Sequence, residues 1–112
     1  MQFLVIGKYT EPGTLLPEDR MPTLINDRVL PALETLAQWE EKGETVKAGG
    51  IFAGQRVGAF FLEAESGEEV GQLLSSLPFW HDVTWDVTPM QSFRSTIERE
   101  THVLEQAQAG AA

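Results

Sequence analysis

The sequence predicts a single α+β domain whose strands and helices follow the order β-α-β-β-α-β. Residues 2–9 and 57–64 are apolar on both alternating faces, as in strands that are covered on both sides. Residues 22–42 and 66–77 repeat apolar side chains at helical spacing. Residues 83–89 alternate bulky and polar side chains, which indicates a further strand. A chain of 112 residues has room for one such domain.

The first strand, residues 2–9, places Phe3 and Val5 on one face and Leu4 and Ile6 on the other. A loop with three prolines follows over residues 10–22. Loops at the end of a sheet often carry function, so this one is either a functional loop or a plain surface connection.

The first helix is predicted over residues 22–42. Pro22 suits its first turn and Gly43 its end. Pro31 lies inside the pattern, where proline removes a backbone hydrogen bond. We therefore expect a bent helix, or a short turn followed by a longer helix. The apolar stripe of this helix consists of Ile25, Val29, Leu33, Leu36 and Ala37.

A hairpin should follow, with strands at residues 45–52 and 57–64 joined by a turn at 53–56. Gly49 and Gly50 mark a bulge, a bend or a close backbone approach in the first of these strands. The second strand places Phe61 on one face and Phe60 and Leu62 on the other.

The second helix begins at Ser66, which with Glu69 forms a capping box. Pro78 ends the helix and leads into the last strand, which closes at Pro89. The buried stripe of the helix consists of Val70, Leu73, Leu74 and Leu77.

We divide the chain into a domain over residues 1–93 and a C-terminal extension over residues 94–112. The extension is helical or partly disordered. Ile97, Thr101 and Leu104 are spaced for a helix that packs on a partner, and disorder is expected beyond about Gln106.

The element order is that of the ferredoxin-like fold, a four-stranded antiparallel sheet with two helices on one face. The first and third strands are also apolar on the face that these helices do not cover. A second copy of the same sheet would cover it. The pattern therefore predicts a homodimer, or a higher homo-oligomer, built as a dimeric α+β barrel.

Composition excludes several classes of function. Seventeen acidic against eight basic residues give a net charge of −9, which disfavours nucleic acid and anionic membranes. The chain has no cysteine, and its two histidines stand in no metal-ligand pattern. No apolar run is long enough to span a bilayer, and the first residues lack the features of a signal peptide. We expect a cytoplasmic protein without metal or nucleotide cofactor.

The segment from Leu77-Pro78 through Val87-Thr88-Pro89 resembles the closing segment of the muconolactone isomerase family. Phe3-Leu4-Val5 and the helix stop at Glu41-Lys42-Gly43 also match that family. The resemblance implies a ferredoxin-like fold, dimers or larger rings, and a pocket between the sheet and neighbouring elements. It also implies a proton shift in an unsaturated lactone, carried out without a cofactor.

The sequence departs from the family after the first helix. There the family has a basic and aromatic run containing His, Trp and Arg. This chain has Val46-Lys47-Ala48-Gly49-Gly50, in which only Lys47 is charged. The two glycines remove hydrogen-bond donors and widen the space at this place.

A proton shift next to a carbonyl needs a base and a donor for the developing enolate. Candidate bases are His81, with Asp82 beside it as an orienting carboxylate, Asp86 in the last strand, and Glu34. Asp86 points either into a barrel interior or to solvent, and His81 is a base or a plain turn residue. Lys47 is a clamp for an enolate or carboxylate, or an edge-strand lysine.

Three residues are candidate contacts to a small-molecule substrate. Tyr9 ends the first strand, where it would donate to an oxyanion or pack as a rim residue. Trp80 and Trp85 would line an apolar ligand pocket or serve the core and the dimer contact.

Three functions remain open from the sequence. The first is a cofactor-free isomerase of the muconolactone type, acting on a small oxygenated metabolite. The second is a non-catalytic dimeric module that binds a ligand or assists another protein. The third is an oxygenase on the same barrel, similar to the antibiotic monooxygenases.

Overall fold

The computed structural model describes residues 1–9 and 20–111. Its elements are β1 (Gln2–Tyr9), α1 (Met21–Leu24), η2 (Ile25–Val29), α2 (Leu30–Lys42), β2 (Val46–Ile51), β3 (Val57–Glu63), α3 (Gly67–Ser75), η3 (Trp80–Asp82), β4 (Val83–Met90) and α4 (Phe93–Ala111). This order confirms the predicted ferredoxin-like α+β fold. The predicted loop over residues 10–22 lies mostly outside the described residues.

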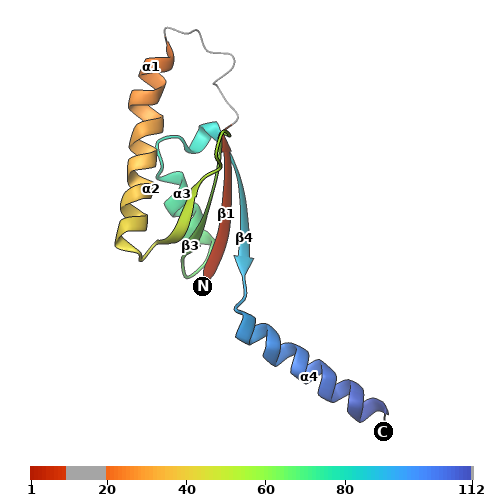
Figure 1. Ribbon diagram of the computed structural model, residues 1–112. Helices are drawn as coiled ribbons and strands as arrows, with labels where there is room; N and C mark the ends of the chain where they lie inside the picture. The colour runs from red at the N-terminus through yellow and green to blue at the C-terminus, as the bar shows by residue number, and fades with distance from the viewer. Residues whose placement is uncertain (10–19, 112) are drawn as a thin grey trace.

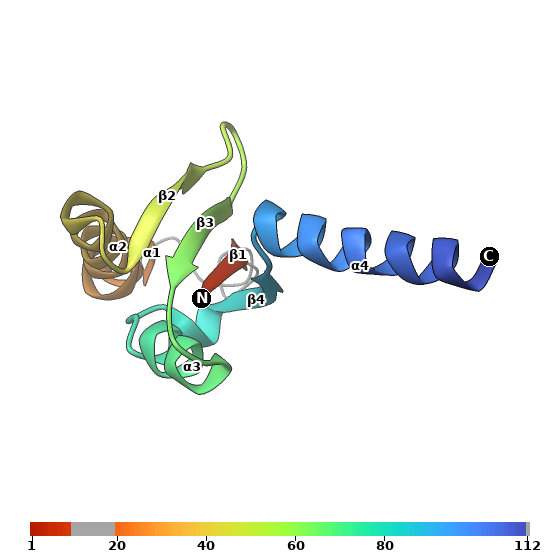
Figure 2. The same cartoon turned by 90° about the horizontal axis from the view of Figure 1, so that it is seen from below.

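The four strands form one antiparallel sheet in the order β2-β3-β1-β4. The segment α1–η2–α2 and helix α3 cover the same face of this sheet (Figures 1 and 2). The core lies between these helices and the sheet, where Val5, Leu62 and Leu74 are fully buried. None of the helices in the described part of the chain is both long and apolar enough to cross a membrane.

Alternate side chains of β1 and β3 point to opposite faces of the sheet, one toward the core and one away from the helices. Phe3 and Val5 point into the core, and their neighbours across β3 are Leu62 and Phe60. Leu4 lies on the opposite, helix-free face, beside Phe61. Ile6 lies on this open face beside Ala59. The structure thus has the two apolar sheet faces that the sequence predicts, one of them without helices.

The predicted interruption at Pro31 takes the form of a π-helical turn over η2. Proline has no N–H to give to residue 27, and its ring crowds the preceding turn. The chain accommodates this with a wider turn, in which the N–H of Leu30 bonds the carbonyl oxygen of Ile25. Helix α2 then ends at Gly43, whose left-handed φ of 70° suits glycine.

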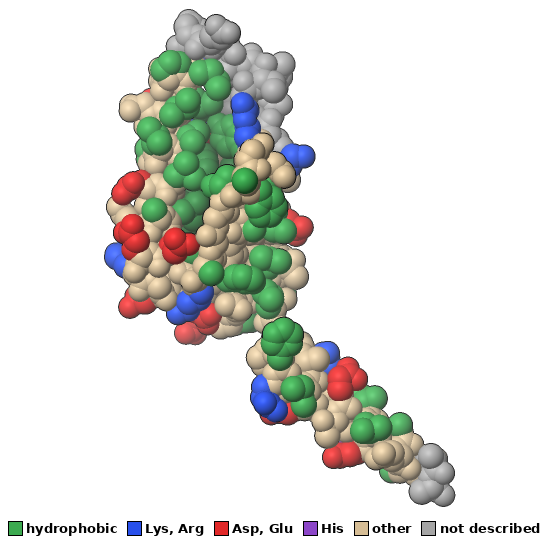
Figure 3. All heavy atoms as spheres, viewed as in Figure 1, with side chains coloured by type: hydrophobic (Ala, Val, Ile, Leu, Met, Phe, Trp, Pro, Cys, Tyr) green, Lys and Arg blue, Asp and Glu red, His purple; other side chains and the backbone are tan. Residues whose placement is uncertain are grey.

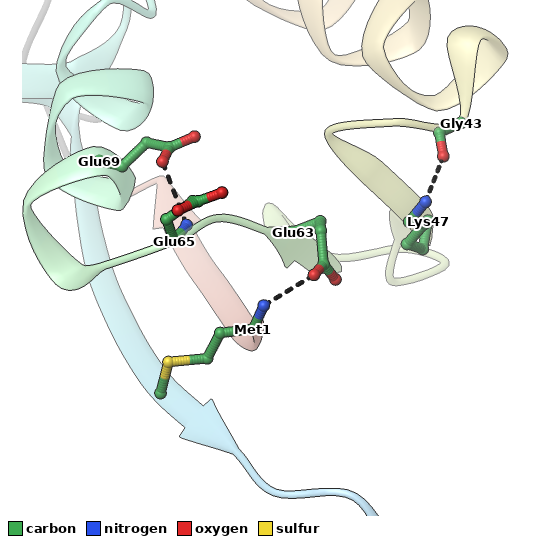
Figure 4. Close-up of polar contacts among 6 residues, drawn as sticks. All are labelled: Met1, Gly43, Lys47, Glu63, Glu65 and Glu69. Atoms are coloured by element: carbon green, nitrogen blue, oxygen red, sulfur yellow. Dashed lines mark hydrogen bonds and ion pairs between the residues drawn. The ribbon is translucent and has the colours of Figure 1, made fainter.

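Helix α3 begins with the predicted cap. The Ser66 side chain accepts a hydrogen bond from the N–H of Glu69 at 3.2 Å. The Glu69 carboxylate accepts in return from the N–H of Glu65 at 3.1 Å, one residue before the cap (Figure 4). Nearby, the amino group of Met1 pairs with Glu63 at 2.8 Å, and this bond lowers the pKa of the Glu63 carboxyl.

The glycine pair in β2 includes a close backbone approach at Gly49, one of the predicted alternatives, whereas the bulge lies elsewhere in the strand. The bulge in β2 falls between Val46 and Ala48, ahead of the glycine pair. Gly49 is still required, because a Cβ there would collide with Phe60 and with the carbonyl oxygen of Ala59 on β3.

Helix α4 extends away from the body of the domain, which gives the molecule extents of 74 × 29 × 26 Å (Figure 1). The helix runs on to Ala111, where the sequence suggested disorder beyond about Gln106. Its apolar side chains are exposed, and Phe93 is 91% accessible.

Candidate functional site

A cavity of about 520 Å³ lies between the segment α1–η2–α2 and the sheet. Figure 3 shows hydrophobic side chains gathered in the hollow between this segment and the β2–β3 hairpin. The volume falls within the range of small-molecule sites.

One wall of the cavity is the apolar stripe predicted for the first helix. Its lining side chains lie three or four residues apart, and therefore on one face of the segment. They are Ile25, Val29, Leu33 and Leu36, with Met21 and Leu24 before them and Ala37 and Glu40 after them.

Glu40 continues this stripe as a carboxylate. It follows Leu36 by four residues and Leu33 by seven, so it shares their face. Among the described residues that line the cavity, Glu40 carries the one carboxylate and Arg56 the one guanidinium. The Glu40 side chain is exposed, so it lies at the solvent edge of the cavity lining, where a carboxylate can serve as a general base.

The sheet side of the cavity is built on one row of paired residues. Across the four strands the row reads Ile51, Gly58, Gly7 and Trp85. A Cβ on Gly7 would lie 2.9 Å from the Trp85 ring, so glycine there lets the indole lie close to the β1 backbone. On the next strand Gly58 has no side chain, and the Cδ1 of Ile51 lies against it. The centre of this wall therefore consists of main chain, the Ile51 side chain and one aromatic ring.

Aromatic rings surround Trp85. Its ring stacks on Trp80 with centroids 6.0 Å apart and meets Phe79 edge-on at 6.1 Å. Its Nε1 donates to the carbonyl oxygen of Trp80 at 3.3 Å. Tyr9 lies against the other side of Phe79, with ring centroids 6.3 Å apart. These contacts hold the aromatic end of the cavity in one arrangement.

The Tyr9 hydroxyl is buried and has no hydrogen-bond partner among the described residues. Burial raises the pKa of this phenol, and the nearby Asp82 carboxylate raises it further, while Arg28 and Arg56 oppose the shift. The phenol is therefore a neutral donor at pH 7. An unpaired buried hydroxyl is costly, and a ligand oxygen that reached it after a local side-chain shift would satisfy it.

We expect Tyr9→Phe to raise the free energy of unfolding at pH 7 by about 1 kcal/mol, because it removes an unsatisfied buried donor. Tyr9 also makes the wild type sensitive to alkali. Its folded-state pKa is raised, so stability present below about pH 10 is lost as the pH rises from there through that pKa. Urea unfolding at pH 7 and pH 11 should show a smaller alkaline loss for the variant. A variant less stable at pH 7 would show that the hydroxyl has a partner.

An ion pair joins the helical segment to the turn before β4. Arg28 donates to both carboxylate oxygens of Asp82 at 3.1 and 3.2 Å. The Asp82 side chain is 8% exposed and that of Arg28 is 51% exposed. The sequence suggested that Asp82 would orient His81; the structure pairs it with Arg28 instead, and His81 is exposed. The pair ties the segment to the end of the sheet beside the cavity.

The other predicted catalytic residues also lie away from the cavity. Asp86 pairs with Ile6, so it lies on the open face of β4, and it is exposed. Lys47 is exposed in β2 and donates to the carbonyl oxygen of Gly43 at 2.7 Å (Figure 4). Glu34 is exposed on α2 and is absent from the lining.

Of the three predicted substrate-binding residues, two line the cavity and one does not. Tyr9 and Trp85 line the cavity, and Trp80 stands behind Trp85. Glu40 and Arg56 were not among the predicted site residues. A charged residue in register with an apolar helical stripe is a signal that would have found Glu40. Arg56 lies in the predicted hairpin turn, and nothing in the sequence distinguishes it.

No group of three or more His, Cys, Asp or Glu side chains in residues 1–9 and 20–111 is arranged to hold a metal ion. The polar groups along the cavity are instead those of Tyr9, Glu40, Gln55 and Arg56. This set can accept and donate protons and bind a carbonyl or hydroxyl oxygen.

By sequence, the chain matches no protein-family model and no curated protein. By structure, it is similar to muconolactone isomerase, with a TM-score of 0.62 and 21% identity over 82% of this chain and 90% of that one. It is also similar to 5-chloro-2-hydroxyhydroquinone dehydrochlorinase from Burkholderia phenoliruptrix AC1100, solved with 2,5-dihydroxybenzoquinone. That match has a TM-score of 0.52 and 23% identity over 85% and 98% of the two chains. At these identities the likeness establishes the fold, and it confirms the predicted resemblance at that level.

Proposed function

We propose that the chain is a cofactor-free enzyme of the muconolactone-isomerase type, which moves a proton within a small oxygenated ring bound in the cavity. The observation that carries this proposal is the placement of Glu40. Its carboxylate continues the apolar wall of a cavity that also contains a guanidinium and a phenol. Proton transfer next to a carbonyl requires this kind of base beside donors.

The proposed reaction is a balanced proton shift. The Glu40 carboxylate takes a proton from the carbon next to the carbonyl, and the electron pair of that C–H bond forms an enolate. A hydrogen-bond donor within reach of the same ring as Glu40 stabilises the enolate oxygen. The protonated Glu40 returns the proton to another carbon of the conjugated system, which moves the double bond and restores the carboxylate.

The names of the two similar structures support the substrate class. One is an isomerase of a lactone, and the other is a dehydrochlorinase of a chlorinated hydroxyhydroquinone, with a dihydroxybenzoquinone in its complex. Both names describe small, oxygenated rings. The cavity has the volume for such rings and the donors for their oxygens.

Proton exchange tests the proposal. The chain is incubated in D₂O with unsaturated γ-lactones and with hydroxyquinones, and deuterium incorporation is followed by NMR. We expect protein-dependent incorporation at a carbon conjugated with the carbonyl, together with movement of the double bond in the lactones. Binding of these compounds without any proton exchange would contradict the proposed enzymatic activity and favour a non-catalytic ligand-binding module.

The alternative is a non-catalytic ligand-binding module. The observation in its favour is the composition of the cavity wall, which is apolar along most of the helical segment and most of the sheet row. His81, Asp86 and Lys47 stand outside the cavity, so their predicted roles need a partner chain or another site. Glu40 decides between the two functions, because a binding module does not need a carboxylate on this wall.

We also propose that the open sheet face pairs with a second copy of the chain. Leu4, Ile6 and Phe61 make this face apolar, and each is only partly buried by its own chain. Asp86 on β4 would then lie at the edge of the barrel interior. Light scattering of the purified chain should give twice the mass of 12.4 kDa, or a higher multiple. A monomer would contradict the dimeric α+β barrel.

A cytoplasmic location remains a prediction.

A further inference from the structure

The cavity is long. Its helical wall runs from Met21 to Glu40, which at 1.5 Å per residue spans roughly 28 Å. Its volume of about 520 Å³ also exceeds the need of a single ring, since an engineered cavity of about 150 Å³ takes up benzene. By volume the cavity has room for about three rings.

The lining opposite the helical wall is rich in aromatic rings. The Trp85 ring lies close over Gly7, and Ile51 Cδ1 lies against Gly58. Phe60 on β3 and Phe79 from the turn after α3 add two further rings. Flat rings stack on such a surface, whereas a flexible chain gains less from it.

Polar groups are few for so large a cavity. Within residues 1–9 and 20–111, Tyr9, Glu40, Gln55 and Arg56 supply them, and the remaining lining is apolar side chain or glycine. A suitable ligand therefore has a large apolar area and a small number of oxygens.

We infer that the cavity binds a planar molecule of two or three fused rings that carries a phenolic or ketonic oxygen. The inference rests on the proposed function in that it names the substrate class for the same site. A single ring would leave most of the volume empty. An alkyl chain would fill the length and leave the aromatic lining without a complementary partner.

Five probes test the inference, three of which differ only in the number of aromatic rings. Phenol, 2-naphthol and 2-hydroxyanthracene each carry one hydroxyl on a planar system. Decahydro-2-naphthol is similarly apolar but puckered, and dodecanoate is a flexible chain. Dissociation constants follow from calorimetry or from quenching of tryptophan emission. We expect affinity to rise roughly tenfold with each added aromatic ring, and 2-naphthol to bind roughly tenfold more tightly than its saturated analogue.

The variant Gly58→Val tests whether the probes bind against the sheet side of the cavity. The new side chain would enter the centre of the sheet row, where a Cβ on residue 58 has Ile51 Cδ1 at 3.0 Å as its nearest contact. Ile51 is 60% exposed, so the end of its side chain has room to move. We expect 2-hydroxyanthracene to bind at least tenfold more weakly, with phenol changed less than twofold. Gly71→Ala is the control, because Gly71 is exposed on α3 and outside the cavity.

Any one of three results would overturn the inference. The protein could bind phenol more tightly than the fused-ring probes, or it could bind dodecanoate more tightly than they do. The Gly58→Val variant could also bind 2-hydroxyanthracene as tightly as the wild type. The comparison of 2-naphthol with its saturated analogue uses the wild type, so it stands even where the variant fails to fold. Fused rings that bind while no compound exchanges protons would refute the enzyme and leave the ligand class intact. Proton exchange and binding that occur only with single-ring compounds would refute the fused-ring ligand class and leave the proposed enzyme intact.

Discussion

Replacing Glu40 with glutamine should lower the rate of proton exchange by about 10²- to 10⁴-fold, the usual contribution of a general base. The amide is nearly the same size and cannot take up the proton. Ligand binding should change little, because the apolar wall and Arg56 remain. Measured by NMR in D₂O, the loss should therefore appear in kcat, with KM nearly unchanged.

Glu41→Gln is the matched control. It makes the same change of charge one residue further along α2, at an exposed position outside the cavity. It should exchange protons at the wild-type rate. Equal losses in both variants would mean that overall charge, and not a base at position 40, determines the rate. Full activity of the Glu40 variant would assign proton transfer to another group.

Replacing Leu62 with alanine should lower the free energy of unfolding by about 2–5 kcal/mol, since it empties a fully buried site in a close-packed core. Leu62 lies near the end of β3, where it pairs with Phe3 on one side and with Val46 on the other. Small domains are stable by only about 5–15 kcal/mol, so the variant should unfold at a much lower urea concentration.

Leu104→Ala is the comparison for this variant. Leu104 is 56% exposed on α4, so the same chemical change should cost less than about 0.5 kcal/mol. A large loss at Leu104 in a dilute monomeric sample would show that α4 packs on the domain. A small loss at Leu62 would contradict the position of the core.

The fold was accessible from the sequence because each element carries its own local signal. Ser66 and Glu69 mark the start of α3, Gly43 ends α2, and Pro31 predicts an interruption in the first helix. The form of that interruption was not predictable. A kink, a break and a π-helical turn all relieve the same missing hydrogen bond, and packing decides among them.

The site was less accessible, because it depends on which sheet face the helices cover. In β1 both faces are apolar, so the sequence leaves this undecided. The helices cover the face that carries Tyr9 and Trp85, which puts Asp86 on the opposite side. Glu40 was overlooked although its spacing from Leu36 placed it on the apolar stripe, because a glutamate near the end of a helix is most often solvated, and Glu40 is indeed exposed.

Methyl NMR of the Ile, Leu and Val side chains during titration with 2-naphthol would test most directly where the ligand binds. The account predicts shifts at Ile25, Leu33 and Leu36 on the helical wall of the cavity. It also predicts that the methyl signals of Leu4 and Ile6, on the open face of the sheet, stay in place. Shifts confined to the open face or to α4 would contradict the assignment of the cavity as the functional site.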